Sequence, residues 1–294
     1  AVERSRGLGD VYKRQILPCY NAHAFMAKTL DSLREQTWRN LEIIIINDGS
    51  TELETLDFLS GIQDEFRVIN QENKGLPAAR NRGFAEASGE YILPLDCDDW
   101  LEPTAVEKLF AALRTGGSKS FAYPQMILEG ELSGETKKDF NFFEQLFLNQ
   151  LPYCLLVSKS AWAEIGGYRE SMRSGYEDWD YNIRLGAAGY IGVTASDPLL
   201  HYRVTNHGML LSKSGKMHCS LWEDIRRNSP HLYGYKELRR HWTHWAGKPS
   251  TYPLSIYWAW LAVCLLSPNN ITNYLVKKMR YFSASRRVSR MHNS

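Results

Sequence analysis

The sequence predicts an α/β fold in which a Rossmann-like, mostly parallel β-sheet is flanked by helices. Apolar strand-like runs alternate with helical segments from residue 16 to about residue 114, at a spacing typical of βαβ units. The run LEIIIIN at 41–47 is apolar and β-branched almost throughout, which indicates a strand that is buried on both of its faces.

The predicted elements follow from local signals. Gly75 opens a helix that Ser88-Gly89 closes, and Asp48-Gly49-Ser50-Thr51 supplies a turn and a helix start. Up to residue 114 we expect strands at 16–18, 41–47, 67–71 and 91–95 and helices at 22–36, 52–65, 76–87 and 103–114. Beyond an irregular stretch we expect a strand at 153–157, a short helix ending at Gly166-Gly167, a helix at 177–188 and a strand at 199–204.

Three parts of the chain differ in character. Residues 1–15 are charged, lack the apolar core of a signal peptide, and are expected to be a non-native leader. If so, the first strand is clipped at Ile16. Within this leader, residues 1–13 are expected to pack against nothing. Residues 16–205 are the α/β domain, and residues 206–294 are a basic, aromatic and mainly helical extension.

Charge is distributed unevenly along the chain. The net charge of +2 gives no reason to expect nucleic acid as a partner. From His201 to Ser294, however, there are 15 Lys and Arg against 3 Asp and Glu. The five cysteines are scattered and include no Cys-x-x-Cys pair, which excludes a zinc site of that type and indicates reduced, cytoplasmic thiols.

An apolar run at 252–266 raises the question of membrane contact. It is shorter than the ~20 residues that a spanning helix needs, and it is rich in Trp and Tyr, which favour the lipid–water boundary. We expect peripheral contact with the inner face of the cell membrane; the alternative is a helix packed on the α/β domain.

Two predicted strands end in acidic residues. Asp48 follows the strand at 41–47, and Asp96, Asp98 and Asp99 follow the strand at 91–95. Ligands of parallel sheets bind beyond the carboxyl ends of the strands. If the strand continues to Asp96, Asp96 and Asp98 share a face while Cys97 turns into the core. Adjacent carboxylates favour a hard divalent cation, Mn²⁺ or Mg²⁺; the alternative is that the acids only cap the next helix.

These residues also carry a resemblance to a known family. The chain resembles the family 2 glycosyltransferases, which have the GT-A fold, from Ile16 to about Met209. Each motif alone is weak, but they occur in the expected order. They are Leu17-Pro18-Cys19-Tyr20-Asn21, Ile46-Asn47-Asp48-Gly49-Ser50-Thr51, Asn73-Lys74-Gly75 with Ala79-Arg80-Asn81, the Asp-x-Asp motif Asp96-Cys97-Asp98-Asp99, and Gly175-Tyr176-Glu177-Asp178-Trp179-Asp180.

The resemblance implies an inverting transfer of a sugar from a nucleotide-sugar donor, with UDP expected as the nucleotide. It implies that Asp48, Arg80 and Asp96 lie at the donor nucleotide and that Asp98 binds the metal. It implies a saccharide or lipid-linked acceptor, in the synthesis of bacterial surface polysaccharide or glycolipid. The alternatives from the residues alone are a helix cap for Asp48 and a solvated helix face for Arg80.

The resemblance also implies that Asp178 is the catalytic base. Asp178 lies in the first turn of a predicted helix, where the helix dipole favours an ionised carboxylate. Glu177 and Asp180, within a turn of it, are lesser candidates. Trp179 and Tyr176 could stack on a sugar, but core packing is at least as good an interpretation of both.

The chain departs from the family pattern in two places. Thr205 stands where many relatives have a histidine that completes the metal shell, so His201 and His207 are expected to be structural or solvated. The expected clipping at Ile16 leaves open a catalytically impaired nucleotide-sugar binding protein. A nucleotidyltransferase is a further alternative, but residues 19–24 lack the glycine-rich basic loop that it needs. Donor sugar, acceptor, linkage and oligomeric state are not encoded in recognisable motifs.

Overall fold

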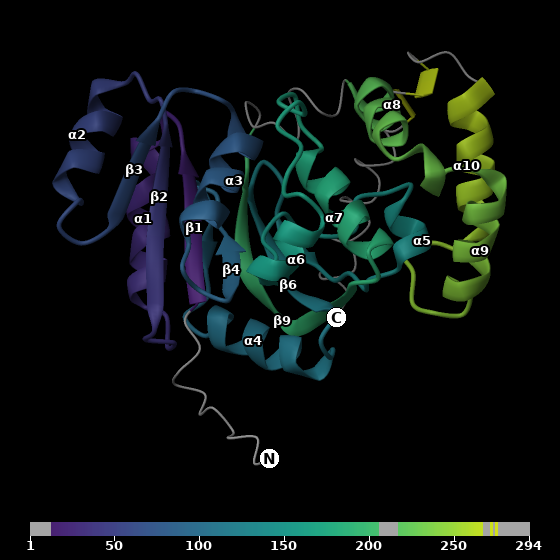
Figure 1. Cartoon of the computed structure of the whole chain (residues 1–294), viewed down its shortest axis with the longest axis horizontal. Coiled ribbons are helices and arrows are strands. Elements are labelled where there is room, and N and C mark those ends of the chain that lie inside the picture. Colours follow the sequence, from purple (N-terminus) through teal and green to yellow (C-terminus); the bar gives the residue numbers. More distant parts are fainter. Residues whose placement is uncertain (1–12, 206–216, 267–270, 273, 276–294) are drawn as a thin grey trace.

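The computed structural model describes residues 13–205, 217–266, 271–272 and 274–275. Its main element is a five-stranded sheet in the order β3-β2-β1-β4-β8 (Figure 1). The first four strands are parallel, and β8 is antiparallel to β4. These strands are β1 (Lys13–Cys19), β2 (Leu41–Asp48), β3 (Arg67–Gln71), β4 (Tyr91–Pro94) and β8 (Val157–Ser158).

Helices cover both faces of this sheet, as the uninterrupted apolar run of β2 predicts. Ile44 and Ile46 belong to one apolar cluster together with Phe84 of α3. Ile45, between them, belongs to the other cluster together with Leu30 of α1. The helices of this half are α1 (His23–Arg34), α2 (Leu53–Gly61) and α3 (Leu76–Glu86).

A glycine lets α3 approach the sheet closely. A Cβ atom at Gly83 would lie 2.8 Å from the side chain of Ile16 on β1. This close contact sets the distance between α3 and the sheet. It thereby also sets the position of Arg80, one turn earlier on the same helix.

A second sheet has the order β5-β9-β6-β7. Its central pair, β6 and β9, is parallel, with register shifts near Pro124 and Gln125. The members are β5 (Trp100–Leu101), β6 (Ser120–Gly130), β7 (Gly134–Thr136) and β9 (Ile191–Val204). Helix α4 (Ala105–Thr115) packs against β6 and β9, and α7 (Glu177–Ala187) against β9. The short helix α5 (Phe142–Gln145) packs against α7, and α6 (Lys159–Glu164) follows β8.

The C-terminal part is helical, as predicted, and packs on the rest of the protein. It consists of α8 (His218–Asn228), a 3-10 turn (Pro230–Leu232), α9 (Tyr235–Trp245) and α10 (Ser255–Leu266). Trp222, Leu238 and Tyr257 from these helices join the same apolar cluster as Phe143 near α5. None of the helices in the described part of the chain has the length and apolar character needed to cross a membrane.

Several sequence-based boundaries need correction. β9 begins at Ile191 rather than at Leu199, and α2 ends at Gly61 rather than at residue 65. β1 begins at Lys13 and pairs with both β2 and β4 from that residue, so the strand is not clipped at Ile16. β4 ends at Pro94, two residues before Asp96. The segment 153–157 is buried but forms a strand only from Val157, while β6 was not predicted. The predicted leader lies, up to residue 12, outside the described residues.

Candidate active site

The carboxyl ends of β2 and β4 and the start of α7 meet at one edge of the five-stranded sheet. Open α/β sheets bind their ligands at such an edge. Asp48 is the last residue of β2, and Asp96 and Asp98 lie in the loop after β4. Ion pairs of Arg80 connect this edge to α7.

Asp48 shapes the loop that leads into α3. Its Oδ1 accepts hydrogen bonds from Gln71 Nε2 at 2.7 Å and from the Lys74 backbone N–H at 2.9 Å, and its Oδ2 accepts one from the Gly75 N–H at 2.8 Å. Gly75 has φ of +90°, in the region that favours glycine. The carboxylate is almost fully buried, so its observed contacts are with the protein's own loop.

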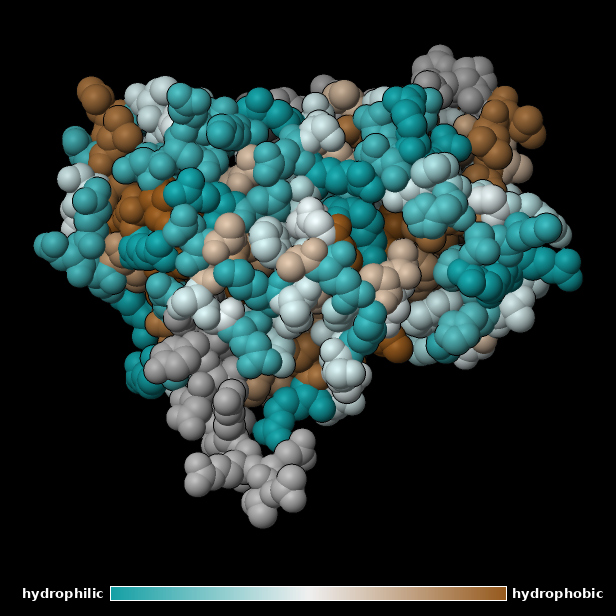
Figure 2. All heavy atoms as spheres, in the orientation of Figure 1, coloured by the Kyte–Doolittle hydropathy of each residue, from teal (hydrophilic) through white to brown (hydrophobic). Residues whose placement is uncertain are grey.

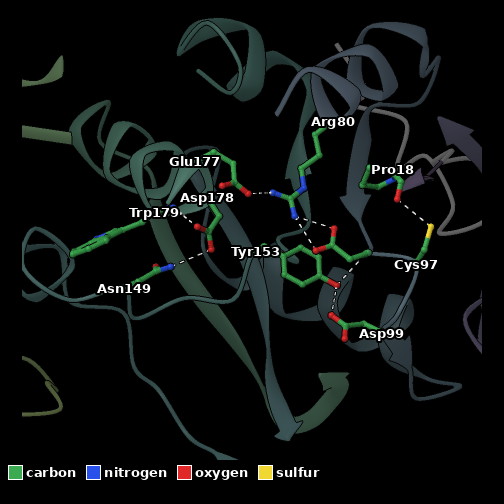
Figure 3. Close-up of polar contacts among 10 residues, drawn as sticks. Pro18, Arg80, Cys97, Asp99, Asn149, Tyr153, Glu177, Asp178 and Trp179 are labelled. Atoms are coloured by element: carbon green, nitrogen blue, oxygen red, sulfur yellow. Dashed lines mark hydrogen bonds and ion pairs between the residues drawn. The ribbon is translucent and has the colours of Figure 1, made fainter. Parts of the chain in front are cut away.

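Arg80 lies at the centre of the site and is 1% exposed. It donates to Glu177 Oε1 at 2.8 Å and to the two oxygens of Asp96 at 2.9 and 3.0 Å (Figure 3). Its guanidinium also lies over the rings of Tyr153, at 5.0 Å, and Tyr168, at 5.5 Å. Arg80 is therefore buried within the site, and the alternative of a solvated helix face is wrong.

Tyr153 holds the loop that contains the Asp-x-Asp motif. Its hydroxyl accepts from the Asp96 backbone N–H at 2.9 Å and donates to Asp99 Oδ2 at 2.7 Å (Figure 3). Cys97 turns into the core, as predicted, and its thiol donates to Pro18 O at 3.0 Å. Asp96 and Asp98 remain partly exposed beside it. The loop thus presents two carboxylates outward and fixes the third, Asp99, inside.

The surroundings of this loop raise the pKa of two of its carboxyl groups, Asp98 and Asp99. Burial, and then the charge of Asp96, raise the pKa of Asp98 to about 6. The same two kinds of effect, with burial first, raise the pKa of Asp99, although that carboxylate accepts hydrogen bonds from Tyr153 and from the Arg203 N–H. The loop therefore holds more negative charge than its protein neighbours compensate.

Asp178 lies in the first turn of α7, on the other side of Arg80. Its Oδ2 accepts from Asn149 Nδ2 at 3.1 Å and its Oδ1 from the Trp179 N–H at 2.8 Å. Burial raises the pKa of Asp178, and the charge of Arg80 opposes that effect. The side chain is oriented by two donors and remains partly exposed, which are the properties a general base needs.

The backbone before these acids is unusual. Tyr176 has φ of +64°, a left-handed conformation that is rare for a residue with a large side chain. Its buried ring packs at 5.0 Å from Trp179, and its hydroxyl lies 2.9 Å from His218 Nδ1. The packing of Tyr176 thus holds a strained turn that sets where Glu177 and Asp178 begin α7.

The lesser candidates have other partners. Burial raises the pKa of Glu177 to about 7 despite its ion pair with Arg80. Asp180 is buried in ion pairs with Arg169 at 3.1 Å and Arg184 at 2.7 Å. Trp179 is buried, and its indole N–H donates to Gln145 O at 2.6 Å, which agrees with core packing rather than sugar stacking.

His201 has the structural role expected of it. Its ring stacks on Trp100 at 4.9 Å, and its nitrogens lie 2.6 Å from Glu129 and 2.7 Å from Glu102. Thr205 directly follows the end of β9. His207 lies outside the described residues.

No group of three or more His, Cys, Asp or Glu side chains within the described ranges is arranged to hold a metal ion. Asp98, with Asp96 beside it, is partly exposed, and burial and the charge of Asp96 raise its pKa. Ions such as Mg²⁺ commonly use only one or two protein carboxylates and take substrate phosphate oxygens for the rest. The residues present therefore fit a cation that arrives with a diphosphate.

Sequence reasoning did not single out Tyr153, Asn149 or Arg203. Tyr153 and Asn149 lie in a stretch without regular secondary structure. Asn149 lies 29 residues before Asp178, which it contacts, and Tyr153 lies 54 residues after Asp99. The one available signal was that Tyr153 lies within, and Asn149 just before, an otherwise apolar segment, LPYCLLV at 151–157, whose polar groups need partners once it is buried.

Comparison with known proteins identifies the family. Residues 15–164, just over half of the chain, match the sequence model described as glycosyl transferase family 2. The chain belongs to this family. The family 2 match includes Asp48, Arg80, Asp96 and Asp98 and ends before α7, so the assignment of Asp178 depends on the geometry described above and on the resemblance of its motif.

Individual relatives agree with the family 2 assignment. Glycosyltransferase GlyA of Streptococcus pneumoniae is 32% identical over 192 residues, which are 60% of this chain and 27% of GlyA. A chondroitin synthase of Pasteurella multocida is 41% identical over 93 residues, which are 31% of this chain and 10% of that protein. The chain spans less than a third of the length of either relative.

A solved structure shares the fold. TarS of S. aureus, residues 1–349 in complex with UDP-GlcNAc, matches with a TM-score of 0.61 at 15% sequence identity, over 93% of this chain and 92% of that one. The predicted GT-A type fold is thereby confirmed.

Proposed function

We propose that this family 2 member transfers a sugar from a UDP-sugar to an acceptor hydroxyl, with inversion at the anomeric carbon. The observation that carries the proposal is the arrangement of acids around Arg80. Asp96 and Asp98 lie on one side, and Asp178 lies on the other beside Glu177. A site of this kind can hold a charged leaving group on one side and deprotonate an attacking hydroxyl on the other.

We assign the donor nucleotide to the side formed by Asp48, Arg80 and Asp96. Asp96 keeps 24% of its side chain exposed while it is paired with Arg80, so it can still accept a hydrogen bond from a ribose hydroxyl. Asp48 acts through the loop at residues 74–75, which it holds in place. The crystallised complex of TarS with UDP-GlcNAc supports a UDP-sugar as donor.

We propose that Asp98 binds a divalent cation, Mn²⁺ or Mg²⁺. Burial, and then the charge of Asp96, raise the pKa of Asp98, and a bound cation would stabilise its ionised form. When bound, such an ion neutralises the negative charge that develops on a leaving diphosphate.

Asp178 is our proposed general base. The acceptor hydroxyl must lose its proton as it attacks the anomeric carbon, and the Asp178 carboxylate receives that proton. Asn149 and the Trp179 N–H fix the orientation of the carboxylate, and its raised pKa makes it a stronger base than an exposed aspartate. Attack from the side opposite the leaving diphosphate inverts the configuration.

The chondroitin synthase among the relatives supports a saccharide acceptor in bacterial polysaccharide synthesis. A lipid-linked acceptor, in surface polysaccharide or glycolipid synthesis, is the alternative that we propose. All five cysteines lie in the described part of the chain and none forms a disulfide, which fits a reducing cytoplasm.

Neither alternative function gains support. The impaired binding protein was motivated by a clipped first strand. β1 instead pairs with β2 from Lys13 to Cys19 and with β4 from Lys13 to Ile16. Family 2 membership favours glycosyl transfer over nucleotidyl transfer.

A panel of nucleotide sugars tests the proposal. One UDP-sugar should raise the melting temperature in the presence of Mn²⁺, and the same donor should release UDP when a matching acceptor is added. The absence of both effects across UDP-, GDP- and dTDP-sugars would count against the proposed activity.

A further inference from the structure

Exposed apolar side chains gather at the end of the molecule that α9 and α10 form. Of the fourteen large hydrophobic side chains that are exposed among the described residues, eight lie between Tyr235 and Leu275. The most exposed of these are Leu266, at 84%, Tyr235, at 67%, and Leu265, at 60%. Figure 2 shows hydrophobic surface at this end, where Figure 1 places α10. Concentrated exposed apolar surface is typical of an interaction site.

The inner face of α10 is already occupied by the protein core. The Tyr257 hydroxyl bonds to the buried Glu144 carboxylate, and the Tyr257 ring stacks on Phe147 at 5.6 Å. The Thr251 N–H, just before α10, donates to the other oxygen of Glu144 at 2.8 Å. These contacts fix the orientation of α10, so a defined face points outward.

The outward face of α10 is apolar along its length. The helix contains no charged residue. Its exposed positions are Ser255, Ile256, Ala259, Ala262, Leu265 and Leu266. A surface helix of a soluble domain normally carries polar residues on its outward face, and α10 does not.

Positive charge lies beside this apolar face. The ring of Tyr235, at the start of α9, is 6.0 Å from the ring of Trp258 on α10, so the two helices are neighbours. Exposed Lys236, Arg239 and Arg240 lie on α9, whose only acid, Glu237, pairs with Arg240. Together with His244, Tyr235 and Thr243 these basic side chains line a shallow depression of about 670 Å³.

We propose that α9 and α10 form a docking surface for an anionic lipid bilayer. The outward face of α10 enters the interface, and the basic side chains of α9 meet the lipid phosphates. An apolar segment and a basic patch together give attachment that neither gives alone. Lipid suits this surface better than a second copy of the chain, because a two-fold contact between copies would bring the same positive charges together. The sequence beyond α10 adds charge of the same sign at Lys277, Lys278, Arg280, Arg286, Arg287 and Arg290.

Co-sedimentation of the full chain with vesicles tests the proposal. The chain should bind vesicles of phosphatidylcholine and phosphatidylglycerol in equal parts, bind phosphatidylcholine vesicles weakly, and dissociate as salt is added. The double variant Leu265→Glu/Leu266→Glu and the double variant Lys236→Ala/Arg239→Ala should each weaken binding by roughly tenfold or more.

Matched variants elsewhere on the surface serve as controls. Leu53→Glu changes a leucine on α2 that is 72% exposed, and Arg114→Ala removes an exposed arginine from α4; both should bind like the unmodified chain. Equal binding to neutral vesicles, no binding to anionic ones, or equal loss in the controls overturns the proposal. So does a change of oligomeric mass caused by Leu265→Glu/Leu266→Glu, which would assign the face to a second copy.

The experiment is independent of glycosyl transfer. The substituted positions contact none of the acids around Arg80, so each variant should keep its thermal stabilisation by the nucleotide sugar. Loss of lipid binding with donor stabilisation retained isolates the docking surface from the proposed activity.

Discussion

The Arg80 guanidinium donates to the Glu177 carboxylate at 2.8 Å, and both side chains are almost completely buried. Through its second terminal nitrogen, Arg80 also holds Asp96. One side chain of α3 thus joins the first residue of α7 to the loop after β4 (Figure 3). The single side chain of Arg80 therefore connects the donor side of the proposed site to the side that contains the base.

Substitution of Arg80 should be strongly destabilising. Arg80→Met leaves the buried Glu177 carboxylate without its partner, and breaking a buried ion pair in this way costs about 3–5 kcal/mol. Urea unfolding measures the loss. Arg82→Met, on the same helix but in an exposed pair with Glu86, is the matched control and should change the stability by less than about 1 kcal/mol. Equal effects of the two variants would show that the buried network is not stabilising α3 against α7.

The Asp178→Asn variant should still bind the donor but should no longer transfer the sugar. An amide cannot accept the acceptor proton at neutral pH, so kcat should fall by about 10²–10⁴-fold. Isothermal titration with the donor, beside a turnover assay, separates binding from chemistry. Asp180→Asn is a poor candidate for the same effect on chemistry, because Asp180 faces Arg169 and Arg184. Its main effect should be on stability. Normal turnover of Asp178→Asn would move the search for the base to Glu177.

The pH profile of kcat/KM should reveal the environment of Asp178. A general base works when ionised, so activity should fall as the pH drops through the raised pKa of Asp178. Asn149 donates a hydrogen bond to this carboxylate and lowers its pKa, so Asn149→Ala should move the acidic limb to higher pH. Asn149→Asp, which adds a like charge, should move it further. A uniform loss of rate with no shift of the limb would assign Asn149 a structural role only.

The sequence predicted which acids lie together at this edge of the sheet better than it predicted the contacts between them. Asp48, Asp96 and Asp98 could be found because each follows an apolar strand, and parallel strands bring such ends together. The contact of Arg80 with Glu177 spans 97 residues, and no local pattern encodes it. The same limit applies to Tyr153 and Asn149, whose roles arise from a buried segment without regular structure.

The strands that were predicted and those that were missed differ in a physical way. β2 is a run of isoleucines that fills two apolar layers, so its sequence alone indicates burial on both faces. β6 contains Pro124 and pairs with β9 through a register shift, which disrupts the periodic pattern. β1 starts with Lys-Arg-Gln, which reads as polar, although its backbone pairs with β2 and β4 from Lys13.

Removal of the Asp98 carboxylate should abolish the metal dependence of donor binding. In Asp98→Ala, UDP should no longer raise the melting temperature more in the presence of Mn²⁺ than in its absence. Asp57→Ala, at an exposed position on α2, is the control and should keep the full Mn²⁺ effect. An undiminished Mn²⁺ effect in Asp98→Ala would remove Asp98 from the metal site.

Tyr153→Phe should weaken donor binding, although the substitution replaces no carboxylate of the site. The Tyr153 hydroxyl is at once the acceptor for the Asp96 N–H and a donor to Asp99, and the residue is buried. Phenylalanine keeps the ring over Arg80 but leaves both polar groups short of a partner, at a cost of about 1–3 kcal/mol each if water cannot replace the hydroxyl. Because Asp96 and Asp98 lie in the same short loop, the loosened backbone should raise the KM for the donor more than it lowers kcat. Chemical denaturation, with donor titration of the same samples, measures both effects.

Tyr202→Phe, which alters a neighbouring tyrosine whose ring lies 6.3 Å from that of Tyr153, is the matched control and should leave the donor KM unchanged. If Tyr153→Phe lowered kcat alone and left the donor KM as it was, the hydroxyl would have to act on the acceptor side of Arg80.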